Sequence, residues 1–330
     1  MLIQTNAPSV PASAATPAQR GGQPFWRANL PLTVTVLAAV ALLVTTVVGV
    51  IMDPRVITGA PAWVKPMKFA ISTVVYCGTL AWLLGFVQGH RRLVALVGYA
   101  SSLSLIVELV IIVGQVVRGT TSHFNISTPF DAALWSVMAG FIGTVWVMNL
   151  IVAGLLLRQK LDDSAFAWSL RLGVLLSAVG MAVAFLMTTL PSPAQAAGMA
   201  AGQAPTHFGA HSVGVEDGGP GLPFLGWSTT GGDLRVAHFV GLHGLQVLPL
   251  LGLLLGALGA RGGLNARQRL GLVWTAGLGY LGLILLLTWQ ALRGQPLLAP
   301  DGLTLAALGA LAVAVAVASV AVLRRSAAHG

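Results

Sequence analysis

Three short segments of this chain carry charged groups and imidazoles within an otherwise apolar sequence. They read APAWVKPMKFAIS at 60–72, RGTTSHFNISTPFD at 118–131 and GGDLRVAHFVGLHGLQ at 231–246. Amines and guanidinium groups bind small anions, carboxylates and imidazoles exchange protons, and imidazoles also ligate haem iron and metal ions. The segments therefore predict a polar pocket, provided that the fold brings them together.

Candidate pocket residues come from these segments and from the apolar run between the first two. They are Lys65, Lys68, Glu108, Gln115, Arg118, His123, Asn125, Asp233, Arg235 and Gln246. His243 and His238 are candidate haem ligands, and haem b is the cofactor that this would imply. The two histidines lie five residues apart, about 140° around a regular helix axis, so they do not face one ion. A haem with two histidine ligands would therefore also require His123.

Polar residues also recur at helical spacing within two of the apolar runs. One stripe consists of Ser101, Ser104, Glu108, Gln115 and Arg118, and the other of Lys65, Lys68, Ser72, Tyr76 and Thr79. In a membrane helix such a stripe faces the bundle interior or a water-filled cavity, because a charge that faces lipid is costly. Both stripes are therefore expected to line the pocket.

Several of these candidates also have a purely structural interpretation. Glu108 could form an ion pair with Arg118 or Lys68 instead of acting as a functional acid. His243 could be a core residue hydrogen-bonded between helices, or a proton-relay group. His238, close to the membrane interface, suits a structural role.

Loop residues have similarly simple explanations. His123 could cap its loop, and Asp131 stands where a helix cap would precede the next apolar run. Arg118 could contact a lipid phosphate. His207 and His211 lie four residues apart, but their Gly/Ala-rich surroundings make a metal site a weak expectation.

The composition indicates that most of the chain is surrounded by lipid. The 330 residues are 56% hydrophobic and only 8% charged, with a mean hydropathy of +0.84. A soluble domain carries roughly a quarter charged residues. The net charge of +9 is spread thinly between apolar runs, which favours membrane orientation over nucleic-acid binding. The single cysteine, Cys77, excludes an intrachain disulfide.

Eight apolar runs reach the roughly 20 residues that a membrane-spanning helix requires. They cover about 30–52, 67–88, 92–114, 131–157, 168–190, 233–258, 270–293 and 301–323. The predicted fold class is an all-α polytopic membrane protein, with a bundle of about eight transmembrane helices over 30–325. Residues 1–29 are expected to be a disordered cytoplasmic tail and 326–330 a second tail. The connector 191–232 is expected to be a long extracytoplasmic loop, disordered in its first half.

The distribution of basic residues predicts that both termini are cytoplasmic. In this orientation the inner segments hold 12 of the 18 Lys and Arg residues, and the outer segments hold 6. Cytoplasmic segments of membrane proteins carry such an excess. Four of the six outer basic residues, Lys65, Lys68, Arg118 and Arg235, belong to the candidate pocket. This concentration on the less basic side favours a functional role for the pocket.

The segments WVKPMKF, RGTTSHFN and HFVGLHGLQ, together with the Ala/Gly/Leu-rich spans, resemble sequences of uncharacterised bacterial multi-pass membrane proteins. The resemblance covers most of the helical core and implies a location in the bacterial cytoplasmic (inner) membrane. It implies no activity. Haem A synthase, another family with eight spans, places ligand histidines on several helices, whereas here only the sixth span has clear intramembrane histidines.

Three functions are compatible with these residues. The first is a membrane redox protein that binds haem or a metal through His243 with His238 or His123. The second is a transporter or receptor for a small anionic ligand, which the outer basic residues would bind. The third is an assembly subunit whose polar cluster only joins helices. The expected partners are the lipid bilayer and a small anionic ligand or a quinone, with no nucleic acid.

Overall fold

The computed structural model describes residues 29–325, and within this range eight helices are long and apolar enough to cross a membrane. They are α2 (Leu30–Met52), α3 (Val64–Leu84), α4 (Arg91–Val117), α5 (Pro129–Arg158), α6 (Ser164–Met187), α8 (Leu234–Ala260), α9 (Ala266–Leu292) and α10 (Gly302–Arg325). The predicted all-α polytopic bundle is confirmed. The two predicted tails lie outside the described residues, apart from Asn29, which caps α2.

Two helices begin four residues before the start that hydropathy predicts, because polar side chains cap them. The Asp163 carboxylate accepts hydrogen bonds from the first backbone N–H groups of α6. Asn265 and Gln268 form a reciprocal capping box at the start of α9. Such caps satisfy backbone donors that have no partner inside the helix. Prediction from hydropathy places the start of each helix too late, because the first turns are polar.

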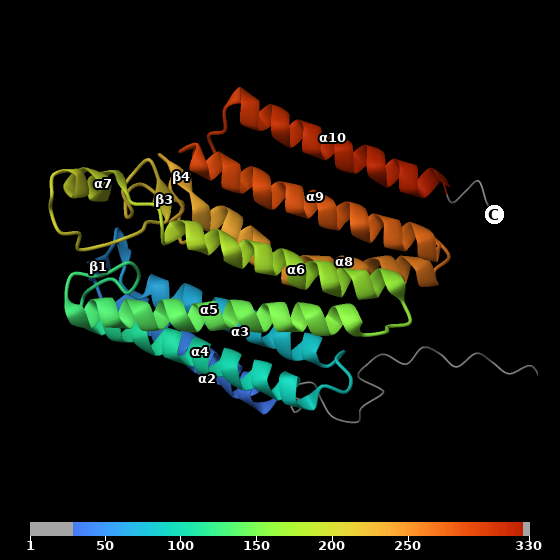
Figure 1. Ribbon diagram of the computed structural model, residues 1–330, viewed down its shortest axis with the longest axis horizontal. Helices are drawn as coiled ribbons and strands as arrows, with labels where there is room; N and C mark the ends of the chain where they lie inside the picture. Colours follow the sequence, from blue (N-terminus) through green and yellow to red (C-terminus); the bar gives the residue numbers. More distant parts are fainter. Residues whose placement is uncertain (1–28, 326–330) are drawn as a thin grey trace, which may run out of the picture.

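The spanning helices run side by side along the long axis of the molecule, with α2 and α10 on opposite margins (Figure 1). Helix α6 lies centrally and packs against α5, α8 and α9, whereas α10 packs against α9. No part of the most apolar stretch of α10 is buried within the protein. The long apolar side chains on this margin are therefore expected to face lipid.

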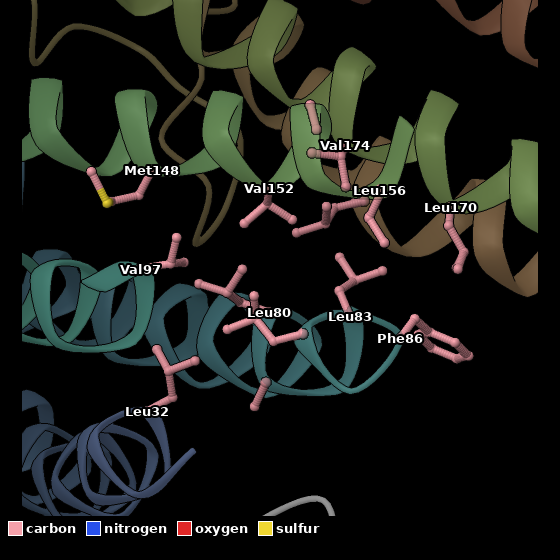
Figure 2. Close-up of a cluster of buried hydrophobic side chains, with 14 of the residues drawn as sticks. Leu32, Leu80, Leu83, Phe86, Val97, Met148, Val152, Leu156, Leu170 and Val174 are labelled. Carbon is pink, nitrogen blue, oxygen red and sulfur yellow. The ribbon is translucent and has the colours of Figure 1, made fainter. Parts of the chain in front are cut away.

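The main core joins the two halves of the bundle. Figure 2 shows Leu80 and Leu83 of α3 pointing toward Val152 and Leu156 of α5, with Val174 of α6 alongside. All five side chains are buried. Membrane helices gain little from hydrophobic burial against one another, so close packing holds this core together.

The pair α6 and α8 approaches most closely, because glycines face each other. A Cβ atom on Gly180 would lie 2.5 Å from the backbone of Gly241, and one on Gly173 would lie 2.9 Å from the Gly244 carbonyl oxygen. Small residues allow such contact between the backbones of membrane helices. The interface fixes the position of α8, which carries His238 and His243.

The connector 191–232, which we call the cap, lies at one end of the bundle beside the α4–α5 loop (Figure 1). It contains α7 (Pro193–Ala200) and β3 (Ser212–Val213), and β3 pairs antiparallel with β4 (Gly232–Asp233). The disorder predicted for its first half is therefore wrong, since residues 193–200 form a helix. The hairpin of β1 (Val56–Ile57) and β2 (Ala60–Pro61) lies at the same end.

Backbone hydrogen bonds attach the cap to the bundle. Phe208 N–H donates to the Phe124 carbonyl and Ile126 N–H to the Thr206 carbonyl, both at 2.9 Å. On the opposite side of the cap, Leu234 N–H donates to the His211 carbonyl at 3.0 Å. The cap therefore covers the end of the bundle that carries the candidate pocket residues.

Candidate functional site

Side chains from three parts of the chain converge beneath the cap, and we call them the histidine cluster: His123, Glu108, His211 and Asp217. The Nε2 atom of His123 lies 3.7 Å from Oε1 of Glu108 on α4. Its ring centroid lies 6.3 Å from that of His211 in the cap and 5.4 Å from that of Phe69 on α3. The His211 Nδ1 atom lies 2.7 Å from Oδ2 of Asp217. The cluster thus connects helix α4, the α4–α5 loop and the cap.

Asn125 holds the loop that presents His123. Its buried side-chain amide donates to Thr120 Oγ1 and to the Thr121 carbonyl, both at 3.1 Å. Its Oδ1 atom accepts hydrogen bonds from the N–H and hydroxyl of Ser127, at 3.0 and 2.7 Å. A side chain that satisfies four local hydrogen bonds stabilises a turn. Asn125, a predicted pocket residue, therefore positions the loop.

Gln115 and Arg118 join α4 to α5 through Asp131. The carboxylate of Asp131 pairs with Arg118 at 2.5 Å and accepts from the Gln115 amide at 2.9 Å. Thr128 caps α5: its hydroxyl accepts from the Asp131 N–H at 3.1 Å and donates to the Asp131 carboxylate at 2.6 Å. The cap of α5 is therefore Thr128 and not Asp131, which lies in the first turn of the helix. Arg118 contacts this aspartate, so its charge is already compensated within the protein.

The basic residues that the sequence predicts to be on the outer side fall into two groups by their pairing. Each of the four arginines forms an ion pair with an aspartate: Arg55 with Asp53 at 2.7 Å, Arg118 with Asp131 at 2.5 Å, Arg235 with Asp233 at 2.5 Å and Arg293 with Asp301 at 2.6 Å. The two lysines form no ion pair within residues 29–325. The uncompensated positive charge of this end is therefore concentrated at Lys65 and Lys68.

The two lysines lie close to the histidine cluster and the cap. The Lys68 ammonium donates to the Leu225 carbonyl in the cap at 3.0 Å. Within the described part of the chain, the half-buried Lys65 side chain makes no hydrogen bond or ion pair, although it lies within electrostatic reach of Glu108 and Asp217. An ammonium group has three donors and is well solvated only when they are satisfied. Lys65 is therefore available to an anionic partner.

The histidines of the cluster are held in their neutral form. Burial, the positive charge of Lys65 and the neighbouring His211 hold the pKa of His123 well below its usual 6.5. Burial also lowers the pKa of His211, although the hydrogen bond to Asp217 opposes this shift. Burial by itself would raise the pKa of Asp217, but the His211 hydrogen bonds lower it below 3.8. Near pH 7 the two histidines thus add no positive charge around Lys65.

Glu108 does not form the ion pair that its sequence context allowed. Arg118 is paired with Asp131, and Lys68 donates to the cap. The Glu108 side chain is only 2% exposed, and its Oε2 atom has no hydrogen-bond partner. Ser104 of the same stripe is buried with an unpaired hydroxyl as well. Ser101, Ser104, Glu108 and Gln115 of the predicted polar stripe on α4 are buried, whereas Arg118 at its end is exposed.

The candidate haem ligands do not converge on one iron. The His238 Nδ1 atom lies 2.8 Å from the Gly180 carbonyl of α6, which supports its structural interpretation. His243 is exposed on α8, where Nδ1 lies 3.3 Å from Oε1 of Gln246. Gln246 in turn donates to Thr79 at 2.9 Å, deep along α3. Among residues 29–325 no group of three or more His, Cys, Asp or Glu side chains could hold a metal ion. His238 and His243 therefore do not form a pair of ligands for one haem iron.

Asp233 and Arg235 form the base of the cap. Their ion pair is extended by a hydrogen bond from Arg235 to the Gly226 carbonyl at 2.6 Å and by one from Ser228 N–H to Asp233 at 2.8 Å. Both candidates thus fix the last part of the cap onto the start of α8.

Sequence reasoning missed His211 and Asp217 as members of the site. His211 was a weak expectation as a metal ligand, because its flexible-looking surroundings gave no sign of a fixed position. The available signal was the acidic turn VEDGG at 215–219, in which Asp217 accepts backbone hydrogen bonds from His211 and Ser212. An aspartate in a glycine-rich turn often makes such bonds.

Comparison of the chain with protein-family models, with curated proteins and with solved structures found no match. The function is therefore inferred from the geometry of the site.

Proposed function

We propose that the protein is a membrane transporter or receptor for a small anionic solute, which it binds beneath the cap at Lys65 and Lys68. One observation carries the proposal. Each of the four arginines predicted to be on the outer side forms an ion pair with an aspartate, whereas these two lysines form none within the described residues. A protein that needed positive charge only for structure could pair the lysines in the same way. Two uncompensated ammonium groups near a closed cap provide the charge that an anion requires.

The neighbouring residues give the site its selectivity. Neutral His123 can offer a hydrogen-bond donor without adding charge, whereas the N–H of neutral His211 is already donated to Asp217. The Asp217 carboxylate disfavours multiply charged anions, which favours a small monoanion such as a monocarboxylate. Because Lys68 also bonds to the cap through Leu225, anion binding at this lysine competes with closure of the cap. The solute would therefore enter from the capped end.

The capped end faces outward in the orientation that the basic residues favour, so we place the site on the extracytoplasmic side of a bacterial cytoplasmic membrane. The excess of Arg and Lys in the uncapped segments supports this assignment. Haem-dependent redox chemistry is not proposed, because His238 and His243 have separate partners.

Thermal unfolding of the purified full chain in detergent tests the proposal. Acetate, succinate, phosphate and sulfate are added separately, and the unfolding midpoint is followed for the wild type, Lys65→Gln, Lys68→Gln and the control Lys160→Gln in the opposite loop. At least one anion is expected to raise the midpoint of the wild type and the control, because a ligand that binds only the folded state stabilises it. Both site variants should lose the response.

Two results would contradict this function. One is an anion response that survives in Lys65→Gln and Lys68→Gln. The other is a visible absorption band in the purified protein that shifts on reduction with dithionite, since this would reveal a redox chromophore.

A further inference from the structure

A column of buried polar atoms without partners extends from the histidine cluster toward the middle of the bundle. It consists of Glu108 Oε2, Ser104 Oγ and Ser101 Oγ on α4 and of the Tyr76 hydroxyl on α3. None of these atoms is accessible to solvent, and none has a hydrogen-bond partner in the protein. Buried polar groups are almost always hydrogen-bonded, so four in succession require an explanation.

Helical geometry places these atoms along one line. Glu108, Ser104 and Ser101 share a face of α4, and Ser101 lies about 10 Å deeper than Glu108 along the axis. Tyr76 follows Phe69 by seven residues, so it shares the face of α3 that contacts His123 and lies deeper by about the same distance. Helices α3 and α4 pack against each other. Tyr76 on α3 and Ser101 on α4 thus both lie about 10 Å deeper in the bundle than the level of the histidine cluster.

The column ends at the main apolar core. Tyr76 packs against the buried cluster that includes Cys77, Leu80 and Val97. Beyond this depth, Figure 2 shows Leu80, Leu83, Val152 and Leu156 between the two halves of the bundle. The polar column therefore begins at Glu108 in the histidine cluster and ends at the apolar core.

We infer that these four side chains hold a chain of bound water molecules, which lets Glu108 exchange protons with the capped side of the membrane. A buried water makes about three hydrogen bonds to polar groups that would otherwise be unpaired. Neighbouring hydroxyl and carboxyl groups supply such partners. His123, at 3.7 Å from Glu108 and 15% exposed, connects the chain to the aqueous side. The apolar core at the other end prevents passage of protons through the whole bundle. The inference does not depend on the anion site.

The three tyrosines of the chain provide an internal test by X-ray hydroxyl-radical footprinting, in which radicals formed from bound water oxidise adjacent side chains. Tyr76 carries the unpaired hydroxyl. Tyr280 donates its hydroxyl to the Val240 carbonyl at 2.5 Å, and Tyr99 is 66% exposed on the outside of α4. With the full chain in detergent, Tyr76 is expected to be oxidised several-fold faster than Tyr280 and Tyr99, although its hydroxyl is not accessible to solvent.

Variants on α4 distinguish oxidation of Tyr76 by bound water from oxidation by bulk solvent that reaches the side chain. Removing the hydroxyls in the double variant Ser101→Ala/Ser104→Ala should lower Tyr76 oxidation to the level of Tyr280. Ser102→Ala is the matched control, because Ser102 also has a buried hydroxyl without a partner. Ser102 lies on a different face of α4, the face of Gly98, and this face contacts Asn29 before α2. This control should leave Tyr76 oxidation unchanged.

The wild-type protein alone can overturn the inference. If Tyr76 is oxidised no faster than Tyr280, the serine hydroxyls bond to carbonyls of their own helix and the column is dry. Equal loss of Tyr76 oxidation in the control Ser102→Ala would equally contradict it.

Discussion

At the residue scale, the site combines histidines that are held in their neutral form with a lysine that has no ion-pair partner in the described residues. His123 and His211 are neutral because they are buried, and Lys65 forms no ion pair within the described residues although Glu108 and Asp217 lie within electrostatic reach. Each arginine at the same end has an aspartate. Arginine suits fixed bidentate pairs, and lysine suits exchangeable partners.

The buried histidines predict that acid loosens the cap. Because the pKa of His123 and of His211 is lowered in the closed state, the open state binds more protons as pH falls below about 6.5. Closure is therefore fully stable above this pH and is progressively lost below it. Glu108, Lys65 and Asp217 face the pair, and Asp217 compensates protonation of His211 in part. His123 should carry the larger effect.

Hydrogen–deuterium exchange of residues 205–215, corrected for intrinsic rates, measures this loosening. Protection should fall between about pH 7 and pH 5 in the wild type and in the control His90→Gln, since this interval spans the usual histidine pKa. The double variant His123→Gln/His211→Gln should have nearly constant protection. A fall of equal size in the double variant would show that other groups control the cap.

At the scale of elements, the position of every site residue depends on helix caps and on close helix packing. The start of α5 relies on Thr128, which caps the helix and bonds to Asp131, and Asp131 in turn pairs with Arg118. Replacing Thr128 by Ala should lower the free energy of unfolding by about 1 kcal/mol, as for other lost helix caps. Ser136→Ala, on the exposed side of α5, should have little effect in the same denaturation experiment. Equal effects of the two changes would contradict the capping role.

The α6–α8 contact predicts a larger effect from a single methyl group. In Gly180→Ala the new Cβ would lie 2.5 Å from the Gly241 backbone, so the helices must separate. We expect destabilisation by about 1–3 kcal/mol, as for other overpacked interiors. Gly140→Ala on α5 is the control, because nothing lies within 4 Å of its new Cβ.

Denaturation in mixed detergent measures both variants. Gly140→Ala should be neutral or more stable by up to about 1 kcal/mol, through higher helix propensity. Unchanged stability in Gly180→Ala would mean that the two helices do not approach as closely as described.

The sequence alone predicted the helices and the buried face of α4 well, because both follow from local periodicity. It could not predict which candidates meet. Arg118 and Glu108 share a face of α4 but find different partners, Asp131 and His123, because partner choice depends on the path of the α4–α5 loop. His211 reaches the site only through the fold of the cap, which no periodic pattern encodes. His243 shares α8 with residues at the site but is exposed.

At the scale of the whole molecule, an even number of described spans places the start of α2 and the end of α10 on the same side. The orientation predicts which loops are accessible from outside the cell. The native Cys77 is fully buried, so the wild-type chain should react slowly with thiol reagents. This low background allows single cysteines to report the position of each loop.

A membrane-impermeant maleimide applied to intact cells tests the orientation. Ala204→Cys, on the exposed part of the cap, should be labelled at once. Gly263→Cys, in the exposed α8–α9 loop, should react only after the membrane is permeabilised. The reverse pattern would place the cap in the cytoplasm, and the anion site with it.

The aspartates that accompany the outer arginines also matter for how the chain enters the membrane. Moving one unit of charge against a potential of 100 mV costs about 2.3 kcal/mol. In the favoured orientation, the capped side and the spans contain six basic and seven acidic residues, and the cytoplasmic segments contain twelve basic and two acidic residues. Asp53 and Arg55, like Asp233 and Arg235, are two residues apart, so each pair can cross as a neutral unit. The loops are therefore translocated with almost no electrical work, and the membrane potential holds the positive excess of the chain inside the cell.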